Sequence, residues 1–236
     1  MHHPRIRANA LSGVERVFVP NQNQRSRYHA RRKLTFTMPD NDLHGNAPDN
    51  APVALLIIDM INDLEFPEGG NFLEPTLRAA DRIVTLKNRV KACGWPVVYV
   101  NDNFGRWRSD FQGVLDHCLH DGVRGQPVVE KLLPDPDDYS VLKPKNSAFY
   151  ATTLNTLLTY LQAKTLILTG ISADSCVLFT ANDAYVRDFR LFIPSDCVVA
   201  ATPQYTNEAL AFMQRVLKAD LTPSDALDLK AMTDPD

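Results

Sequence analysis

The chain has 236 residues, of which 44% are hydrophobic, with 25 Lys and Arg, 28 Asp and Glu, and a formal net charge of -3. That is enough apolar material for one large domain with a full core. The four cysteines are widely spaced without a CxxC pair, and no apolar run approaches the roughly 18 to 20 residues of a membrane-spanning helix. These features argue against a disulfide framework, a zinc knuckle and a membrane protein, and we expect a soluble, cytoplasmic protein.

The N-terminal segment differs from the rest of the chain in charge. Residues 1–37 carry seven Arg and one Lys against Glu15, about +7, which leaves about -10 of the net -3 for the remainder. Since apolar periodicity is also lacking, we predict a basic, disordered arm over residues 1–50 and a folded domain over 51–236. The arm is a solvated tail or an extension before a start at Met38, an organelle transit peptide, or a tail for an anionic partner. No later basic-aromatic pattern indicates a nucleic-acid partner.

From Ala51 onward, short apolar runs alternate with longer helical patterns. This rhythm predicts an α/β fold, a single Rossmann-like three-layer domain with a central parallel sheet and helices on both faces. The predicted strands are Val53–Asp59, Pro96–Asp102, Tyr139–Lys143, Thr165–Gly170 and Leu191–Asp196.

Helical periodicity marks the segments between these strands. One helix face is formed by Leu77, Ala80, Ile83, Val84 and Val90, and another by Leu154, Leu157, Leu158 and Leu161. We predict further helices over Ala209–Leu217 and from Thr222-Pro223 onward, where a cap and an N1 proline precede Asp225. The breakers in Glu65–Phe72 predict a flexible loop near the site entrance.

Three chemically active side chains lie where predicted strands end. Asp59 ends the first strand, Lys143 ends the third, and Cys176 follows the fourth. Ligands of parallel sheets bind beyond these ends. Each residue alone has an ordinary explanation as a cap, a solvated lysine or a packing cysteine. Burying a carboxylate and an ammonium together is costly unless they pair or react, so their coincidence indicates a reactive site.

Cys176 follows "TGISADS" in the first turn of a predicted helix. Free amides, the helix dipole and a nearby Lys143 would each favour its thiolate, and a carboxylate such as Asp59 could accept the thiol proton. The same amides could bind an oxyanion.

Three segments resemble the signature segments of the isochorismatase-like cysteine hydrolases, a superfamily that includes nicotinamidases, N-carbamoylsarcosine amidase and isochorismatases. They are "LLIIDMINDL", "LKPKNSAFYATTLNTLL" and "LILTGISADSCVLFTANDAYVRDFRLFIPSDCV", within Val53–Leu227. The resemblance implies an Asp59-Lys143-Cys176 triad and a sheet in which the Lys143 strand lies beside the Asp59 strand, followed by the Cys176 strand.

The resemblance also implies a cis peptide bond between Ile171 and Ser172, which would aim the amides of Ser172 and Cys176 into an oxyanion hole. It implies assembly into dimers or tetramers as well. The glutamine that the family usually carries after "DM" is Ile61 in this chain.

The segment after the second predicted strand departs from the nicotinamidase pattern. Asp102 is present, but Asn103–Arg106 replace the metal-binding histidines of nicotinamidases, so we expect no metal and no nicotinamidase. His117 and His120 share an i, i+3 spacing, but two lone histidines on an exposed helix are usually not a metal site.

The substrate-side candidates are aromatic and basic. Arg106 or Arg108 could anchor a carboxylate, and Phe104 or Trp107 could form a stacking wall; packing or a subunit interface explains this loop equally well. Phe149 is a further candidate for substrate contact. We expect Cys197 to serve packing, Cys93 to close a helix and Cys118 to lie on one, and none of them has the acid and base surroundings proposed for Cys176.

The sequence therefore predicts a cysteine hydrolase that cleaves an amide or ureido carbon-nitrogen bond of a small molecule through a Cys176 thioester, without a cofactor. Vinyl-ether hydrolysis of an isochorismate-like substrate is one alternative, which needs acid catalysis more than a thiol. A ligand-binding or redox-sensing protein without catalysis is another.

Overall fold

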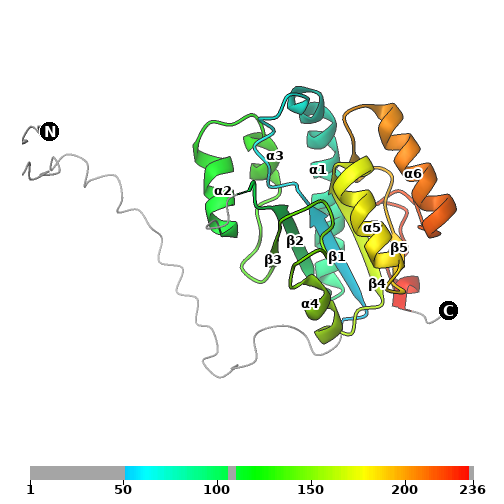
Figure 1. The fold of residues 1–236 in the computed structure, drawn as a ribbon. Helices are drawn as coiled ribbons and strands as arrows, with labels where there is room; N and C mark the ends of the chain where they lie inside the picture. The colour runs from blue at the N-terminus through cyan, green and yellow to red at the C-terminus, as the bar shows by residue number, and fades with distance from the viewer. Residues whose placement is uncertain (1–50, 106–109, 234–236) are drawn as a thin grey trace, which may run out of the picture. The chain divides into compact units, whose positions relative to one another are not determined.

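The computed structural model describes residues 51–105 and 110–233 (Figure 1). The strands are β1 (Val53–Ile58), β2 (Val97–Asp102), β3 (Tyr139–Lys143), β4 (Thr165–Ile171), β5 (Arg190–Phe192) and β6 (Val198–Val199). The helices are α1 (Gly69–Ala92), α2 (Phe111–His120), α3 (Gln126–Lys131), α4 (Leu154–Tyr160), α5 (Leu178–Tyr185) and α6 (Pro203–Leu217). A π-helical turn, η2 (Ala173–Val177), precedes α5, and a 3-10 turn, η3 (Lys230–Thr233), follows α6.

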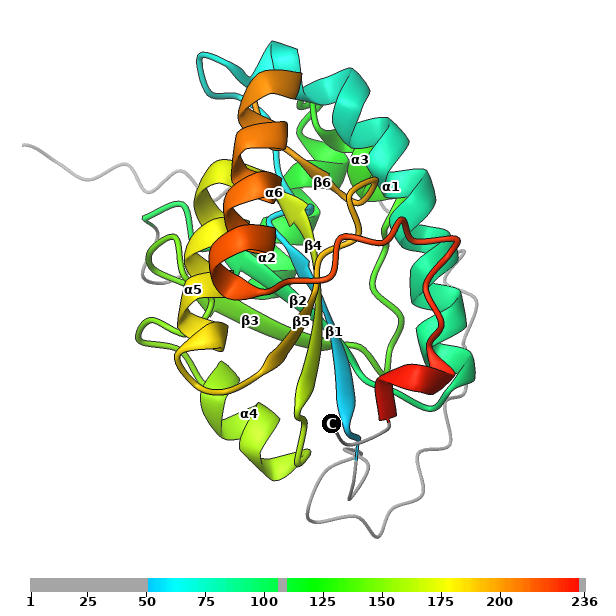
Figure 2. The ribbon, with the colours of Figure 1, turned by 90° about the vertical axis from the view of Figure 1, so that its right-hand side faces the viewer.

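The predicted α/β fold with a parallel sheet is confirmed. All the pairings of the sheet are parallel, in the order β3-β2-β1-β4-β5, with β6 paired to the end of β4. Figure 2 shows α1 on one face of the sheet and α5 and α6 on the other. Among the described residues, none of the helices combines the length and apolar character needed to cross a membrane.

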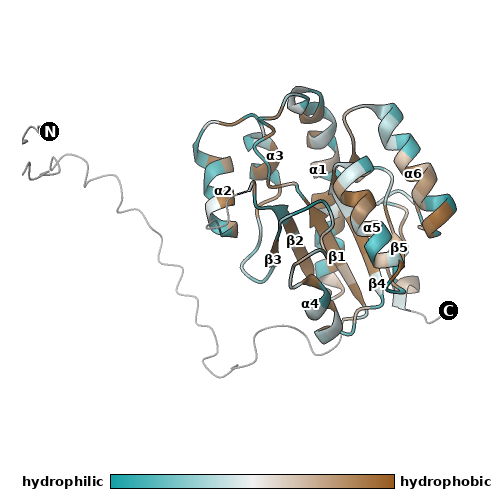
Figure 3. Ribbon diagram, viewed as in Figure 1, coloured by the Kyte–Doolittle hydropathy of each residue, from teal (hydrophilic) through white to brown (hydrophobic). Residues whose placement is uncertain are grey.

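The core forms two layers because β1 is apolar on both faces. Val53, Leu55 and Ile57 pack toward α1, α2 and α3, whereas the alternate residues Ala54, Leu56 and Ile58 pack toward α4, α5 and α6. Figure 3 shows the central strands as the hydrophobic interior, with hydrophilic positions on the helices outside them. A near-continuous apolar run is typical of a strand that is covered on both faces.

The predicted strand order was wrong in one respect. Lys143 ends β3, which pairs with β2 and not with β1, so β2 separates the Lys143 strand from the Asp59 strand. The β3 register places Lys143 directly beside Asp102. The long lysine side chain spans the intervening strand, so the three predicted residues still meet.

The predicted loop at Glu65–Phe72 is shorter than expected because α1 begins at Gly69. A Cβ atom on Gly69 would lie 1.9 Å from the carbonyl oxygen of Leu64. This glycine therefore lets the start of α1 approach the Leu64 backbone closely. We attribute Gly69 to this packing and not to a flexible loop.

The chain after β4 also differs from the prediction. The fifth predicted strand ends early, at Phe192, and the short strand β6 follows it. Helix α6 begins at Pro203, with the Thr202 hydroxyl accepting a hydrogen bond from the Tyr205 amide at 3.2 Å, and it ends at Leu217 as predicted.

The helix predicted from Thr222-Pro223 does not form; the segment makes a turn. The amide and the hydroxyl of Ser224 each donate to the Asp196 carboxylate at 2.8 Å. These bonds hold the segment against the connection between β5 and β6. They give the Ser224 amide an acceptor outside a helix, so helical hydrogen bonds are not needed there.

Candidate active site

The carboxyl ends of the strands bring Asp59, Lys143 and Cys176 together. Nζ of Lys143 lies 2.8 Å from Oδ2 of Asp59 and 3.3 Å from Sγ of Cys176. Lys143 is fully buried, Asp59 is 4% exposed and Cys176 is half-buried. The arrangement is a buried ion pair with a partly accessible thiol at one end.

Asp59 is held by backbone groups of β2. It lies at the turn after β1 with φ of 51°, its amide donates to the Val100 carbonyl at 2.8 Å, and its Oδ1 accepts from the Asp102 amide at 2.7 Å. The buried Asn101 side chain donates to the Ile61 carbonyl at 2.7 Å and so fixes the next residues of the turn. The carboxylate is thereby oriented before any ligand binds.

Cys176 depends on the sharp turn at the end of β4. Gly170 has φ of 113°, and a Cβ atom there would lie 2.0 Å from the Ile58 carbonyl oxygen, so both conformation and space require glycine. The Ile171–Ser172 peptide bond is cis, and the amides of Ser175 and Val177 both donate to the Ser172 carbonyl. This turn places Cys176 within η2, immediately before α5.

The loop after Lys143 is tied to the helix that follows Cys176. Nδ2 of Asn146 donates to the Ser175 hydroxyl at 2.6 Å, and the Ala148 amide donates to the Thr180 hydroxyl at 3.0 Å. The Ser147 hydroxyl donates to Asp183 on α5. The lysine and the cysteine are therefore positioned by one connected set of hydrogen bonds.

The electrostatics of the site differ from the expectation for the thiol. Burial raises the pKa of Cys176 to about 12, and the Asp59 charge adds to this effect, while Lys143 only partly opposes it. Burial also raises the pKa of Asp59 above its usual value in spite of Lys143. For Lys143, burial disfavours the ammonium, but Asp59 and Cys176 outweigh it and raise its pKa. These shifts favour the neutral form of the thiol, and they make Asp59 a stronger base than an ordinary aspartate.

Among the predicted substrate contacts, only Phe104 lies near these strand ends in the described structure. Its amide donates to Oδ1 of Asp102 at 2.6 Å, and its side chain is partly buried against the core. Arg106, Trp107 and Arg108 lie outside the described residues.

The structure does not bring Phe149 to the site. It is 5% exposed, its ring centroid lies 6.0 Å from that of Phe189, and the Arg187 guanidinium lies 4.8 Å above it. Because Phe149 belongs to the core under α5, substrate contact would require that core to open.

The two histidines of α2 point to separate partners. His117 contacts Asp121 through Nδ1 at 2.7 Å and Asp63 through Nε2 at 3.3 Å, whereas His120 contacts the Asp116 carbonyl. Within the described residues, the group with metal-binding spacing consists of Asp135, Asp137 and Asp138.

Lysine already occupies that acidic group. Nζ of Lys91 contacts Asp135, Asp137 and Asp138 at 2.7 to 3.1 Å, so an ammonium supplies the balancing charge. We interpret the group as an ion-pair cluster.

The sequence interpretation overlooked the contact between Asp102 and Lys143. Oδ2 of Asp102 lies 3.8 Å from Nζ of Lys143, and the Asp102 side chain is 39% exposed. Asp102 ends a strand, as Asp59 and Lys143 do, so the same criterion applied to the second strand would have found it.

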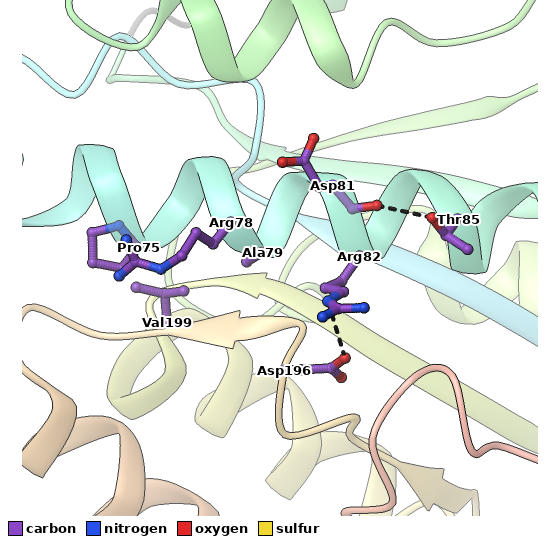
Figure 4. Close-up of a pocket in the computed structure, with 8 residues that line it drawn as sticks. All are labelled: Pro75, Arg78, Ala79, Asp81, Arg82, Thr85, Asp196 and Val199. Carbon is purple, nitrogen blue, oxygen red and sulfur yellow. Dashed lines mark hydrogen bonds and ion pairs between the residues drawn. The ribbon is translucent and has the colours of Figure 1, made fainter.

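A pocket of about 570 Å³ lies elsewhere, between α1 and the segment around β6 (Figure 4). None of the predicted site residues lines it; the lining residues are Pro75, Arg78, Ala79, Asp81, Arg82, Thr85, Asp196 and Val199. Arg82 and Asp196 form a long ion pair of 4.0 Å across it. The case for the site at the strand ends therefore rests on side-chain geometry.

Comparisons with known proteins show the family of the chain. The isochorismatase domain model matches residues 53–224. A protein of Bacillus subtilis called uncharacterized isochorismatase family protein YaaI is 40% identical over 177 residues, which cover 75% of this chain and 97% of that protein. An isochorismatase of Bacillus subtilis is 32% identical over 167 residues, 68% of this chain and 52% of that protein, so the chain spans about half its length.

Among solved structures, the N-carbamoylsarcosine amidase of Thermoplasma acidophilum superposes with a TM-score of 0.57 and 26% identity, over 75% of this chain and 98% of that chain. The domain match covers all the described strands of the sheet and includes all three strand-end residues. The chain belongs to the isochorismatase family of hydrolases.

Proposed function

We propose that this protein is a cysteine hydrolase that cleaves an amide or ureido carbon-nitrogen bond of a small molecule through a thioester on Cys176. The observation that carries the proposal is the position of the Lys143 ammonium between Oδ2 of Asp59 at 2.8 Å and Sγ of Cys176 at 3.3 Å. A nucleophile, a base and a fixed cation in contact are the parts that acyl transfer needs. A solved relative named as an amidase supports the same chemistry.

The first half-reaction forms the thioester. Asp59 takes the Cys176 proton as sulfur attacks the substrate carbonyl, and the carbonyl electron pair moves to oxygen. The amides of Ser172 and Cys176 are the proposed oxyanion hole, since Cys176 is the fourth residue of its helical turn and early helical amides lack intrahelical acceptors. When the carbon-nitrogen bond breaks, Asp59 returns the proton to the leaving nitrogen.

The second half-reaction releases the acid. Asp59 takes a proton from water, which attacks the thioester carbonyl, and the carbon-sulfur bond breaks. The proton then returns from Asp59 to the Cys176 sulfur. Lys143 remains protonated throughout and balances the charge that moves between carboxylate and sulfur. The raised pKa of Asp59 suits both steps because it brings the acid and base forms closer in free energy.

Vinyl-ether hydrolysis is the second candidate, and the relative named isochorismatase favours it. That reaction requires proton donation but no sulfur nucleophile. The thiol in contact with Lys143 has no role in it, so the first candidate uses more of the site.

The test is rapid-quench mass spectrometry of the intact protein during turnover of small amides and ureido compounds. We expect a transient acyl adduct on Cys176, no adduct with Cys176→Ala, and a loss of turnover of at least about a thousandfold in that variant and in Asp59→Asn. Product release without an adduct would overturn the thioester and point to acid catalysis. A stable sulfenic acid under mild peroxide, with no turnover of any compound, would favour the redox-sensing alternative.

A further inference from the structure

Asp102 provides a second carboxylate at the site, and the mechanism above gives it no role. Its backbone amide donates to Asp59, and its Oδ1 accepts a hydrogen bond from the Phe104 amide. Its Oδ2 lies 3.8 Å from Nζ of Lys143, which is too long for a hydrogen bond. Among the described residues, no hydrogen bond to Oδ2 is present, so this oxygen is an acceptor with free capacity.

The free oxygen lies close to the reacting sulfur. Nζ of Lys143 is 3.8 Å from Oδ2 of Asp102 and 3.3 Å from Sγ of Cys176, so the two atoms are at most about 7 Å apart. Asp102 is also 39% exposed, whereas Asp59 and Lys143 are buried. Of the three charged groups in contact with one another, Asp102 is the one that an incoming substrate can reach.

Among the residues that the structure describes, the charges at the strand ends do not cancel. Asp59 and Asp102 both contact one ammonium, that of Lys143. Asp174, in the same turn as Cys176, is exposed and adds a further negative charge. A substrate carboxylate next to the scissile bond would enter this negative field, whereas an N–H group would find an acceptor.

We propose that Asp102 determines specificity at this site: its carboxylate favours neutral substrates that donate N–H groups and disfavours substrates that carry a carboxylate beside the reacting carbon. The substrate class rests on the proposed function, because it assumes that Cys176 is the nucleophile. Asp102 forms no bond in the reaction and loses no proton.

Alkylation of Cys176 tests this selectivity without turnover. Iodoacetamide and iodoacetate are similar in size and differ in charge, and both react with the same thiolate. Their rate ratio therefore cancels any change in the thiol pKa. The rates are measured by mass spectrometry of the peptide that carries Cys176, in the full chain, relative to glutathione.

We expect wild-type Cys176 to prefer iodoacetamide over iodoacetate by about tenfold more than glutathione does. The Asp102 charge, within about 7 Å of the sulfur, repels the iodoacetate carboxylate through partly buried surroundings of lower dielectric than water. Asp102→Asn should remove most of this preference. Asp102→Glu, which keeps the charge, should retain it. Asp174→Asn, which removes an exposed and screened charge from the same turn, should change it less than about twofold.

The assignment would be overturned by no excess preference in wild type, by full preference in Asp102→Asn, or by loss of preference in Asp174→Asn alone. Equal loss in Asp102→Asn and Asp102→Glu would also overturn it, because the effect would then come from geometry and not from charge. If the preference depends on Asp102 but no amide or ureido compound acylates Cys176, the proposed function fails while the selectivity of the thiol stands.

Discussion

At the scale of single residues, the Asp59-Lys143 pair has consequences for stability as well as for chemistry. Lys143 is fully buried and Asp59 is 4% exposed, so neither charge is solvated in the folded protein. Removing one partner of a buried pair leaves the other uncompensated and typically costs about 3 to 5 kcal/mol.

We predict that Lys143→Met destabilises the protein by about 3 kcal/mol at pH 8. Without the ammonium, the pKa of Asp59, already raised by burial, rises further above its unfolded value. A group with a raised folded-state pKa binds its proton more tightly when folded, so the loss of stability is smaller at pH 5 than at pH 8.

Urea unfolding at the two pH values provides the measurement. The double variant Asp59→Asn/Lys143→Met is the control, and it should be more stable at pH 8 than Lys143→Met alone because no buried charge remains. Equal stability of wild type and Lys143→Met at pH 8 would contradict the predicted cost of leaving the buried Asp59 carboxylate without its ammonium partner.

The residue types of the site were predictable, but their electrostatics were not. Asp59, Lys143 and Cys176 were found because each ends or follows an apolar run, a property of local sequence. The thiol pKa went in the direction opposite to the expectation because burial and the Asp59 charge outweigh Lys143, and burial is a tertiary property. The burial of Phe149 was unpredictable for the same reason: a loop aromatic gives no sign of whether it packs under a helix.

At the scale of elements, the contact between β1 and β4 depends on one glycine. Gly170 pairs with Ile58 in the parallel register, and an added Cβ would meet backbone atoms of Ile58 at 2.0 and 2.8 Å. Backbone atoms in the middle of a sheet cannot yield as a flexible side chain can.

We predict that Gly170→Ala costs at least about 3 kcal/mol of stability and reduces the iodoacetamide reactivity of Cys176, because the turn that positions the thiol starts there. Gly122→Ala is the matched control: Gly122 also has a positive φ, 70°, but nothing lies within 4 Å of its added Cβ. It should cost only about 1 kcal/mol. Stability is measured by urea unfolding. Similar losses in the two variants would show that the cost comes from the positive φ angle and not from the close approach of β4 to Ile58.

A second element-scale contact joins α2 to the segment between β1 and α1. His117 bridges Asp121 and Asp63, and hydrogen bonds to these two carboxylates raise the pKa of its imidazole above 6.5. Protonated His117 therefore stabilises the folded state below about pH 6.5, and this contribution is lost as pH rises through the folded-state pKa.

We expect His117→Gln to lower the urea midpoint more at pH 6 than at pH 9. His120→Gln is the control, since His120 contacts a backbone carbonyl on its own helix and no carboxylate among the described residues. A midpoint difference that does not change with pH would rule out the charge contribution of His117.

Element order was less predictable than element position. The apolar runs located five of the six described strands, β6 being the exception. The order in which parallel strands pair depends on how the crossovers pack, which no local pattern records. This explains why β2 was not expected between β3 and β1. Likewise, Thr222-Pro223 has the local chemistry of a helix start. The segment instead forms a turn in which Ser224 donates two hydrogen bonds to the Asp196 carboxylate.

At the scale of the whole molecule, the core draws on elements from β1 to the last turn of the described chain. One core layer runs from Val53 to Met232 and the other from Ala54 to Ala219. Assembly into a dimer or tetramer, which the resemblance implied, stays a prediction. We would look for such an interface at the exposed apolar side chains of α5, its C-cap residue and α6, namely Phe179, Tyr185, Val186, Tyr205, Phe212 and Val216.

We predict that a chain beginning at His44 keeps the free energy of unfolding of the full chain to within about 0.5 kcal/mol, as for changes remote from the core. A chain beginning at Leu55 is the matched comparison. It lacks the Ala51 amide, which donates to Leu161 at 2.8 Å, and the register pairs of Val53 with Thr165 and Ala54 with Leu166. Losing these buried residues from a central strand should cost several kcal/mol, roughly 1.5 to 3 per large side chain.

Both chains are compared with the full chain by urea unfolding. If the His44 chain lost as much stability as the Leu55 chain, the basic N-terminal residues would belong to the fold, and the predicted boundary near residue 50 would be wrong.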